Sequence, residues 1–123
     1  FIGSLPRAEY LQLLAAGDVL LDPLHFGGGN TTYEALALGK PVVTWPSPFL
    51  RGRLSYAMYR QMGFTDLVVN DFASYAALAI RLAQDNDFRR NASDTILAQS
   101  EILYRDDEAV RGFEKFLMEA AGR

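Results

Sequence analysis

The chain of 123 residues has no cysteine, a single histidine and no long apolar run. Without cysteine there can be no disulfide framework, no thiolate zinc site and no cysteine nucleophile. Its apolar stretches are interrupted within about ten residues, which is too short for a membrane span. The formal net charge of −3 provides no broad basic field for nucleic acid or for an anionic membrane. Because no signal peptide is visible, we expect a cytoplasmic location.

The remaining composition is that of an ordinary globular domain, with 50% hydrophobic and 22% charged residues. The length fits one domain or part of one. Residue patterns predict an α/β part over about residues 1–70 and a helical tail over about 71–123. The expected helices are 6–16, one ending at Gly39, 53–62, 72–83, 87–103 and 108–120; the expected strands are 18–22, 41–45 and 65–69, with a proline loop at 46–52 and the tail of a further strand at Phe1 and Ile2.

Strands that are apolar without alternation, separated by helices, predict a parallel sheet buried on both faces. The expected fold class is therefore α/β, with a partial Rossmann-like parallel sheet and helices on both of its faces. In such open sheets the crossover is right-handed and ligands bind outside the carboxyl ends of the strands.

The stretch "LHFGGGNTTYEALALGKPVV" places three glycines between a strand and a helix. The first N–H groups of a helix lack intrahelical partners, and glycines let an anion approach them. Asn30, Thr31 and Thr32 could donate further hydrogen bonds, and Glu34, one turn later, could accept two from a ribose diol. The alternative is a surface loop in which an Asn or Thr caps the helix and Glu34 completes the cap. The residues alone leave both interpretations open.

Two familiar nucleotide motifs are excluded. The loop has no Gly-Lys-Ser/Thr ending, so it is not a P-loop, and Thr32 replaces the third glycine of the dinucleotide fingerprint. Neither kinases nor NAD enzymes are favoured.

The longer run "LLDPLHFGGGNTTYEALALGKPVVTWPSPFLRGRLSYAMYRQMGF" resembles the carboxyl-terminal catalytic half of the O-GlcNAc transferase (SPINDLY-like) glycosyltransferases. The resemblance covers roughly residues 3–70 and implies the second Rossmann-like domain of a GT-B enzyme, of the bacterial type with tetratricopeptide repeats. The positions that carry it are Leu21, Asp22, Gly28, Gly29, Asn30, Thr31, Thr32, Glu34, Ala35, Leu36, Gly39, Pro41, Val42, Val43 and Thr44.

By this resemblance the diphosphate of a UDP-sugar would lie on Gly28, Gly29, Asn30, Thr31 and Thr32. Glu34 would hold the ribose, and Arg53 matches a family arginine that could face the ligand or the facing domain. The UDP-sugar is the donor substrate, and no metal or other cofactor is expected, because a helix terminus can balance the charge that a metal would otherwise balance. In the family a lysine and a glutamine upstream also hold the leaving group; Lys40 is a poor substitute because it lies at the far end of the helix.

Two further features have competing interpretations. His25 is the natural candidate for a catalytic base because an imidazole titrates near neutral pH, but ligand contact or loop packing explains it as well. Asp85, Asn86 and Asp87 spell the Asp-x-Asp pattern that binds a divalent metal in another glycosyltransferase fold. At a joint between helices this cluster predicts helix capping by Asn86 or Asp87 instead.

The function implied is the UDP-sugar-binding part of an inverting glycosyltransferase that transfers a sugar, with N-acetylglucosamine expected, to protein hydroxyls. The protein acceptor would bind through regions upstream, so residues 1–123 alone are expected to be inactive and to dimerise through an exposed sheet edge. The alternatives are another GT-B enzyme, acting on lipid or polysaccharide or as a UDP-sugar epimerase, and a non-catalytic interaction module with this fold.

Overall fold

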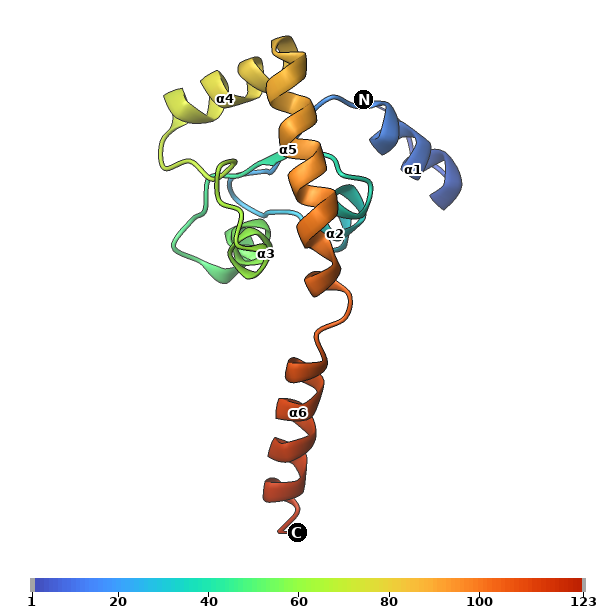
Figure 1. Cartoon of the computed structure of the whole chain (residues 1–123), viewed down its shortest axis with the longest axis vertical. Helices are drawn as coiled ribbons and strands as arrows, with labels where there is room; N and C mark the ends of the chain where they lie inside the picture. The colour runs from blue at the N-terminus through green and yellow to red at the C-terminus, as the bar shows by residue number, and fades with distance from the viewer. Residues whose placement is uncertain (1, 123) are drawn as a thin grey trace.

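The computed structural model describes residues 2–122, which form a mixed α/β body from which the last helix extends (Figure 1). The helices are α1 (Arg7–Ala16), α2 (Asn30–Ala37), α3 (Leu54–Met62), α4 (Phe72–Gln84), α5 (Asn86–Gln99) and α6 (Asp107–Ala120). Two 3-10 helices, η1 (Leu50–Gly52) and η2 (Ser100–Leu103), and two strands, β1 (Leu20–Leu21) and β2 (Val42–Val43), complete the described elements.

The strand–loop–helix–strand unit around the glycines is confirmed. β1 and β2 pair in parallel, with Leu20 opposite Val42 and Leu21 opposite Val43, and α2 makes the crossover between them. Each strand has only two residues, so the predicted strands 18–22 and 41–45 were too long. The carboxyl ends of both strands lead into the loops 22–29 and 44–53, which therefore share one edge of the sheet.

The predicted third strand, 65–69, was wrong as a full strand: only one parallel bridge joins Thr44 to Val68. The reason lies in the Tyr59 hydroxyl, which accepts from the Val42 N–H at 3.0 Å and donates to the Val42 carbonyl at 2.9 Å. A buried tyrosine thus occupies the backbone groups that a third strand would need.

One core joins the first and second halves of the chain. Leu36 of α2, Val43 of β2 and Tyr59 of α3 are buried together with residues from the predicted helical tail. Those tail residues are Leu82 of α4 and Ile96 of α5, both fully buried. Helices α4 and α5 therefore complete the α/β body.

The boundaries of the later helices differ in detail from the prediction. The expected helix 87–103 is divided into α5 and η2, and Asp85 is the cap of α5, accepting from the Phe88 N–H at 2.9 Å. Capping was thus correctly predicted, but Asn86 and Asp87 were the wrong residues. At the amino end Ile2 lies outside any strand, and Phe1 lies outside the described residues. The loop 46–52 contains η1, which follows both prolines.

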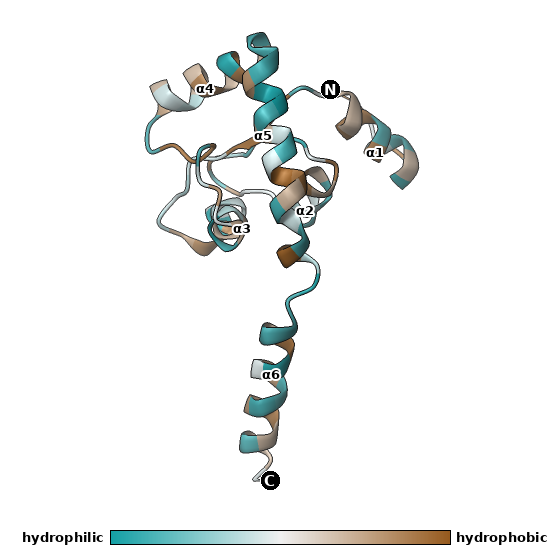
Figure 2. Cartoon of the chain, in the orientation of Figure 1, coloured by the Kyte–Doolittle hydropathy of each residue, from teal (hydrophilic) through white to brown (hydrophobic). Residues whose placement is uncertain are grey.

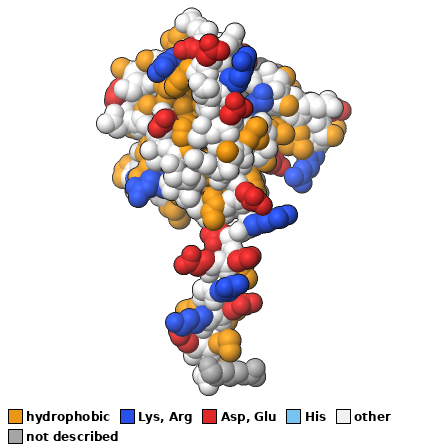
Figure 3. Space-filling model, in the orientation of Figure 1, with side chains coloured by type: hydrophobic (Ala, Val, Ile, Leu, Met, Phe, Trp, Pro, Cys, Tyr) orange, Lys and Arg blue, Asp and Glu red, His pale blue; other side chains and the backbone are white. Residues whose placement is uncertain are grey.

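α6 stands apart from the body in Figure 1, and none of its residues is buried. Figure 2 shows hydrophilic and hydrophobic residues alternating around it, and Figure 3 shows charges of both signs along it. Its exposed apolar side chains are Val110, Phe113, Phe116, Leu117 and Met118. No helix among residues 2–122 is long and apolar enough to cross a membrane.

Candidate functional site

The first turn of α2 offers unused backbone donors. Gly29 precedes the helix as its cap and provides no side-chain cap. Among residues 2–122, no acceptor takes the N–H groups of Gly29, Asn30 or Thr31. The side chains of Asn30 and Thr31 are exposed beside these groups. Because the helix dipole adds positive potential at this end, the arrangement suits an anion.

Two of the three glycines before α2 are closely packed. A Cβ on Gly28 would clash with the hydroxyls of Thr31 and Thr32, and one on Gly27 would lie 3.0 Å from a carboxylate oxygen of Asp22. The loop backbone therefore lies directly on the side chains around it. This is a structural reason for glycine at these positions, in addition to the access for an anion that the sequence suggests.

The buried Asp22 side chain holds the glycine loop in position through hydrogen bonds. This carboxylate is only 5% exposed; Oδ1 accepts from the Gly28 N–H and Oδ2 from the Thr44 hydroxyl, both at 2.7 Å. The Tyr75 hydroxyl donates to the Asp22 carbonyl at 3.0 Å. Sequence reasoning missed Asp22 as a site residue, although a lone carboxylate at the end of an apolar strand was the available signal.

Thr32 connects the loop to α3. Its side chain is buried, and its hydroxyl lies 3.0 Å from that of Ser55. The Thr32 N–H donates to the Gly29 carbonyl. Thr32 therefore faces the protein interior, whereas Asn30 and Thr31 face solvent. The predicted contact of Thr32 with a diphosphate stays a prediction, and the exposed pair is better placed for it.

Glu34 lies on the side of α2 that faces α1. Its Oε1 is 3.2 Å from Nη2 of Arg7, and its side chain is 25% exposed. Burial, and secondly the negative charge of Glu34, raise the pKa of Tyr10. A half-exposed ion pair of this kind is worth only about 0–1 kcal/mol, so Arg7 could yield to a ligand. The predicted ribose contact of Glu34 stays a prediction.

The loops after β1 and β2 are bonded to each other. The Gly27 N–H donates to the Arg51 carbonyl at 2.8 Å, and Nε of Arg51 donates to the His25 carbonyl at 3.1 Å. Arg53 donates from Nη1 to the Ser47 carbonyl at 2.8 Å. His25 is exposed beside the glycine loop, and its predicted part as a base stays a prediction.

Cavities flank this arrangement. A hollow of about 60 Å³ touches Gly28 and Thr31 at the start of α2. A larger cavity of about 450 Å³ lies beyond the end of β2 and is lined by Pro46, Arg53, Tyr56, Val68, Val69, Asn70 and Ser74.

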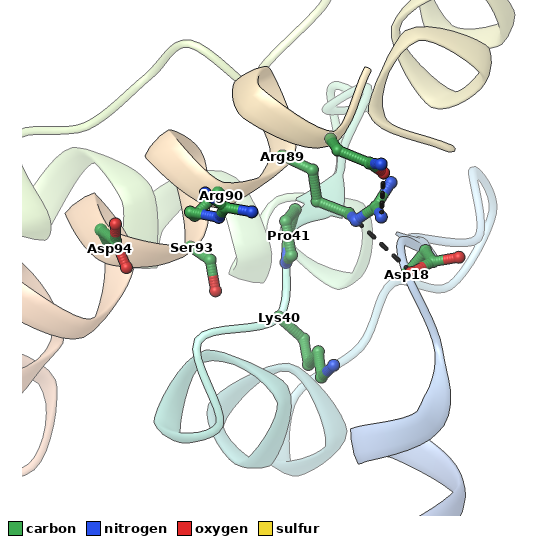
Figure 4. Close-up of a pocket in the computed structure, with 8 residues that line it drawn as sticks. Asp18, Lys40, Pro41, Arg89, Arg90, Ser93 and Asp94 are labelled. Carbon is green, nitrogen blue, oxygen red and sulfur yellow. Dashed lines mark hydrogen bonds and ion pairs between the residues drawn. The ribbon is translucent and has the colours of Figure 1, made fainter. Parts of the chain in front are cut away.

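A third cavity, of about 400 Å³, lies before the amino ends of the strands and includes Asp18, Lys40 and Arg89 (Figure 4). Arg89 is held there by Asp18 at 3.4 Å and by the Leu82 carbonyl. The structure therefore places Lys40 at the opposite end of the sheet from the glycine loop, as the sequence predicted.

The structure thus combines a strand, a glycine loop and an uncapped helix start on a parallel sheet. The model of glycosyl transferase family 41 matches residues 4–103. The chain belongs to glycosyltransferase family 41. This confirms the resemblance drawn from the sequence, and the family match ends before α6 begins.

Several curated proteins are similar to this chain. A probable UDP-N-acetylglucosamine--peptide N-acetylglucosaminyltransferase SPINDLY from Petunia hybrida is 30% identical over 77 residues, 63% of this chain and 8% of that protein. A UDP-N-acetylglucosamine--peptide N-acetylglucosaminyltransferase from Caenorhabditis elegans is 29% identical over 85 residues, 69% of this chain and 7% of that protein. The chain therefore spans under a tenth of these curated relatives.

A solved structure supports the fold. A mutant of the Thermobaculum terrenum O-GlcNAc transferase superposes with a TM-score of 0.76 at 26% sequence identity, covering 98% of this chain and 25% of that one. The α/β fold class is thereby confirmed, and this chain corresponds to about a quarter of the solved one.

Proposed function

We propose that residues 1–123 bind the UDP part of a sugar nucleotide, within an enzyme that transfers N-acetylglucosamine to protein hydroxyls. The observation that carries the proposal is the set of three N–H groups, at Gly29, Asn30 and Thr31, that have no acceptor among residues 2–122 of this family 41 chain. The names of the relatives supply the sugar and the protein acceptor, since they are UDP-N-acetylglucosamine--peptide transferases.

The proposed mechanism is stabilisation of the leaving group. When an acceptor hydroxyl attacks the anomeric carbon, the bond to the diphosphate breaks and negative charge accumulates on its oxygens. Fixed N–H donors bind this charge more strongly in the transition state than in the ground state, which lowers the barrier. Asp22 contributes by fixing the Gly28 backbone, so that the donors need no rearrangement during the reaction. We propose that these donors, rather than a metal ion, balance the charge.

The volumes support a shared site. Pockets for small molecules usually enclose about 300–1,000 Å³. The hollow that touches Gly28 and Thr31 has only about 60 Å³ and is also lined by Leu20, Ala35 and Val42 of β1, α2 and β2, so it cannot enclose a nucleotide. This chain would therefore supply one wall of a nucleotide site. We propose that the other wall, the remaining diphosphate ligands and the acceptor site come from other regions of the polypeptide. Residues 1–123 alone would then bind UDP weakly and would not turn over.

The test is a UDP titration by calorimetry on the intact protein carrying Asn30→Ala and Thr31→Ala together. Two lost hydrogen bonds of about 0.5–1.5 kcal/mol each predict an affinity roughly tenfold weaker. Asn91→Ala, at an exposed position of α5, is the matched control and should bind UDP as the wild type does. Because alanine retains the backbone N–H groups, this variant tests the side chains of Asn30 and Thr31, and unchanged affinity would reject their predicted contact with UDP.

A separate assay distinguishes an enzyme from a non-catalytic module. Incubating the intact protein with UDP-N-acetylglucosamine should release UDP, and candidate acceptor proteins should increase the release. Binding of the donor without any release would favour the non-catalytic alternative.

A further inference from the structure

A buried serine of α3 reaches the backbone of the glycine loop. Ser55 lies in the first turn of α3 and is fully buried. Its hydroxyl is 3.0 Å from the hydroxyl of Thr32 and donates to the Gly28 carbonyl at 3.5 Å. A hydroxyl has one proton to donate, so Thr32 donates to Ser55 and Ser55 donates to Gly28. The two hydroxyls therefore form a short chain of hydrogen bonds that ends on the loop backbone.

The peptide unit between Gly28 and Gly29 carries this contact to the proposed anion site. The unit is trans and planar, so the Gly28 carbonyl and the Gly29 N–H point in opposite directions from one rigid group. A bond that fixes the carbonyl on the side of α3 thereby fixes the direction of the N–H. This N–H is one of the three that have no acceptor among residues 2–122. The hydrogen bond from Ser55 also polarises the amide, which makes its N–H a better donor.

The next N–H group along the loop is oriented in a different way. The Asn30 N–H shares a peptide unit with the Gly29 carbonyl, which accepts from the Thr32 and Tyr33 N–H groups at 3.0 and 3.1 Å. The first turn of α2 therefore orients the Asn30 N–H by its own backbone bonds. The Gly29 N–H, one position earlier, instead depends on a side chain from another helix.

We propose that Ser55 is a positioning residue for the donor diphosphate, because its hydroxyl directs the Gly29 N–H toward the ligand. The inference rests on the proposed function, since it concerns one of the same three N–H groups. Ser55 acts through the peptide unit and does not touch the ligand, because its side chain is fully buried. A donor that is already oriented needs no rearrangement when negative charge develops on the leaving group. Removing the Ser55 hydroxyl should thus weaken UDP binding although every group that contacts UDP is retained.

The experiment is a UDP titration of the intact protein carrying Ser55→Ala, by calorimetry and by nuclear magnetic resonance of the backbone amides. The affinity for UDP should fall about three- to tenfold, as expected for one lost neutral hydrogen bond. Before UDP is added, the Gly29 amide signal should differ from that of the wild type more than the Asn30 signal does. Ser55→Thr keeps the hydroxyl and should restore both the affinity and the Gly29 signal. If the added methyl group prevents folding, Ser55→Ala and its control decide.

Ser93→Ala is the matched control, because it removes a bond of the same kind at the other end of α2. The Ser93 hydroxyl donates to the Gly39 carbonyl, and Ser93 lines the cavity shown in Figure 4. Any general loss of stability that follows from a missing serine bond affects this variant as well. Its affinity for UDP and its Gly29 amide signal should nevertheless equal those of the wild type.

Two results would overturn the assignment. If UDP shifts the Gly29 amide of the wild type but Ser55→Ala binds UDP equally well, Ser55 does not position the donor. If Ser55→Ala and Ser93→Ala weaken UDP by the same factor, the effect comes from stability and not from the direction of one N–H. The failure of the proposed function looks different, because in that case UDP shifts none of the amides of Gly29, Asn30 and Thr31 in the wild type.

Discussion

Replacing Asp22 tests how the glycine loop is held. Its carboxylate accepts one hydrogen bond from Gly28 and one from Thr44, each 2.7 Å long. Hydrogen bonds to charged groups contribute about 1.5–3 kcal/mol each. Thr44 is fully buried, whereas Gly28 is half-buried and can be reached by water. We therefore expect Asp22→Ala to lower the free energy of unfolding by about 3 kcal/mol, at the lower end of the sum.

Asp22→Asn gives a graded comparison. The amide retains one acceptor oxygen and can keep one of the two hydrogen bonds. Asp22→Asn should therefore lower the free energy of unfolding by roughly 1.5 kcal/mol. Thr44→Val removes only the hydrogen bond from Thr44 to Asp22. The double variant Asp22→Ala/Thr44→Val should lose less free energy of unfolding than the two single variants together, because both single changes remove this same hydrogen bond.

The assay is urea unfolding followed by circular dichroism. Asp66→Ala is the control because Asp66 is exposed. If Asp22→Ala unfolds at the same urea concentration as this control, the structural role of Asp22 is refuted. If the Asp22 and Thr44 effects add in full, the two residues are not coupled as the structure indicates.

Three other predictions concern the fold around the site. Tyr59→Phe should cost about 2–4 kcal/mol in urea unfolding, since it leaves the Val42 N–H and carbonyl buried without a partner; a change below about 0.5 kcal/mol would contradict this. Two bonds from Ser74 lower the pKa of Asp71 below its usual 3.8, so the cap of α4 is fully stabilising above pH 3.8 and is lost as the pH falls through the lower folded-state pKa. In the wild type, protection of the Ser74 amide from hydrogen exchange should fall over that pH range. In Asp71→Asn this pH dependence should disappear, and identical pH profiles in the two proteins would refute the role of Asp71 as a cap. Finally, β1 pairs only with β2 among residues 2–122, and Leu21 on it is 53% exposed, so the isolated chain should self-associate in light scattering and Leu21→Lys should reduce this. If the isolated wild-type chain stays monomeric, the prediction of self-association through the edge of β1 is wrong.

Local patterns predicted the unit that carries the site. Apolar strands around "GGGNTT" and the stop at Gly39 were sufficient to predict β1, α2 and β2 in order, because each signal acts within a few residues. Gly39 does adopt a left-handed backbone, with φ of 67°. A cap at the start of α5 was also predictable, since a cap depends on residues three apart, although Asp85 provides it and not Asn86 or Asp87.

Contacts between distant residues were not predictable. The bond from Tyr59 to Val42 shortens the sheet, yet nothing near 65–69 in the sequence indicates it. Likewise, Thr32 and Ser55 are 23 residues apart, and only the fold shows that Thr32 faces inward. The pair of Arg7 and Glu34 depends in the same way on the packing of α1 against α2. Tertiary packing therefore decides which of the predicted site residues remain open to a ligand.

The measurement that tests the central claim most directly is nuclear magnetic resonance of the backbone amides during titration with UDP. If the start of α2 binds the diphosphate, the amide signals of Gly29, Asn30 and Thr31 shift most, and inorganic pyrophosphate shifts the same signals. The amide of Lys40, at the other end of α2, should stay in place. Saturating UDP that leaves the three amides unshifted, or shifts Lys40 instead, would contradict the account.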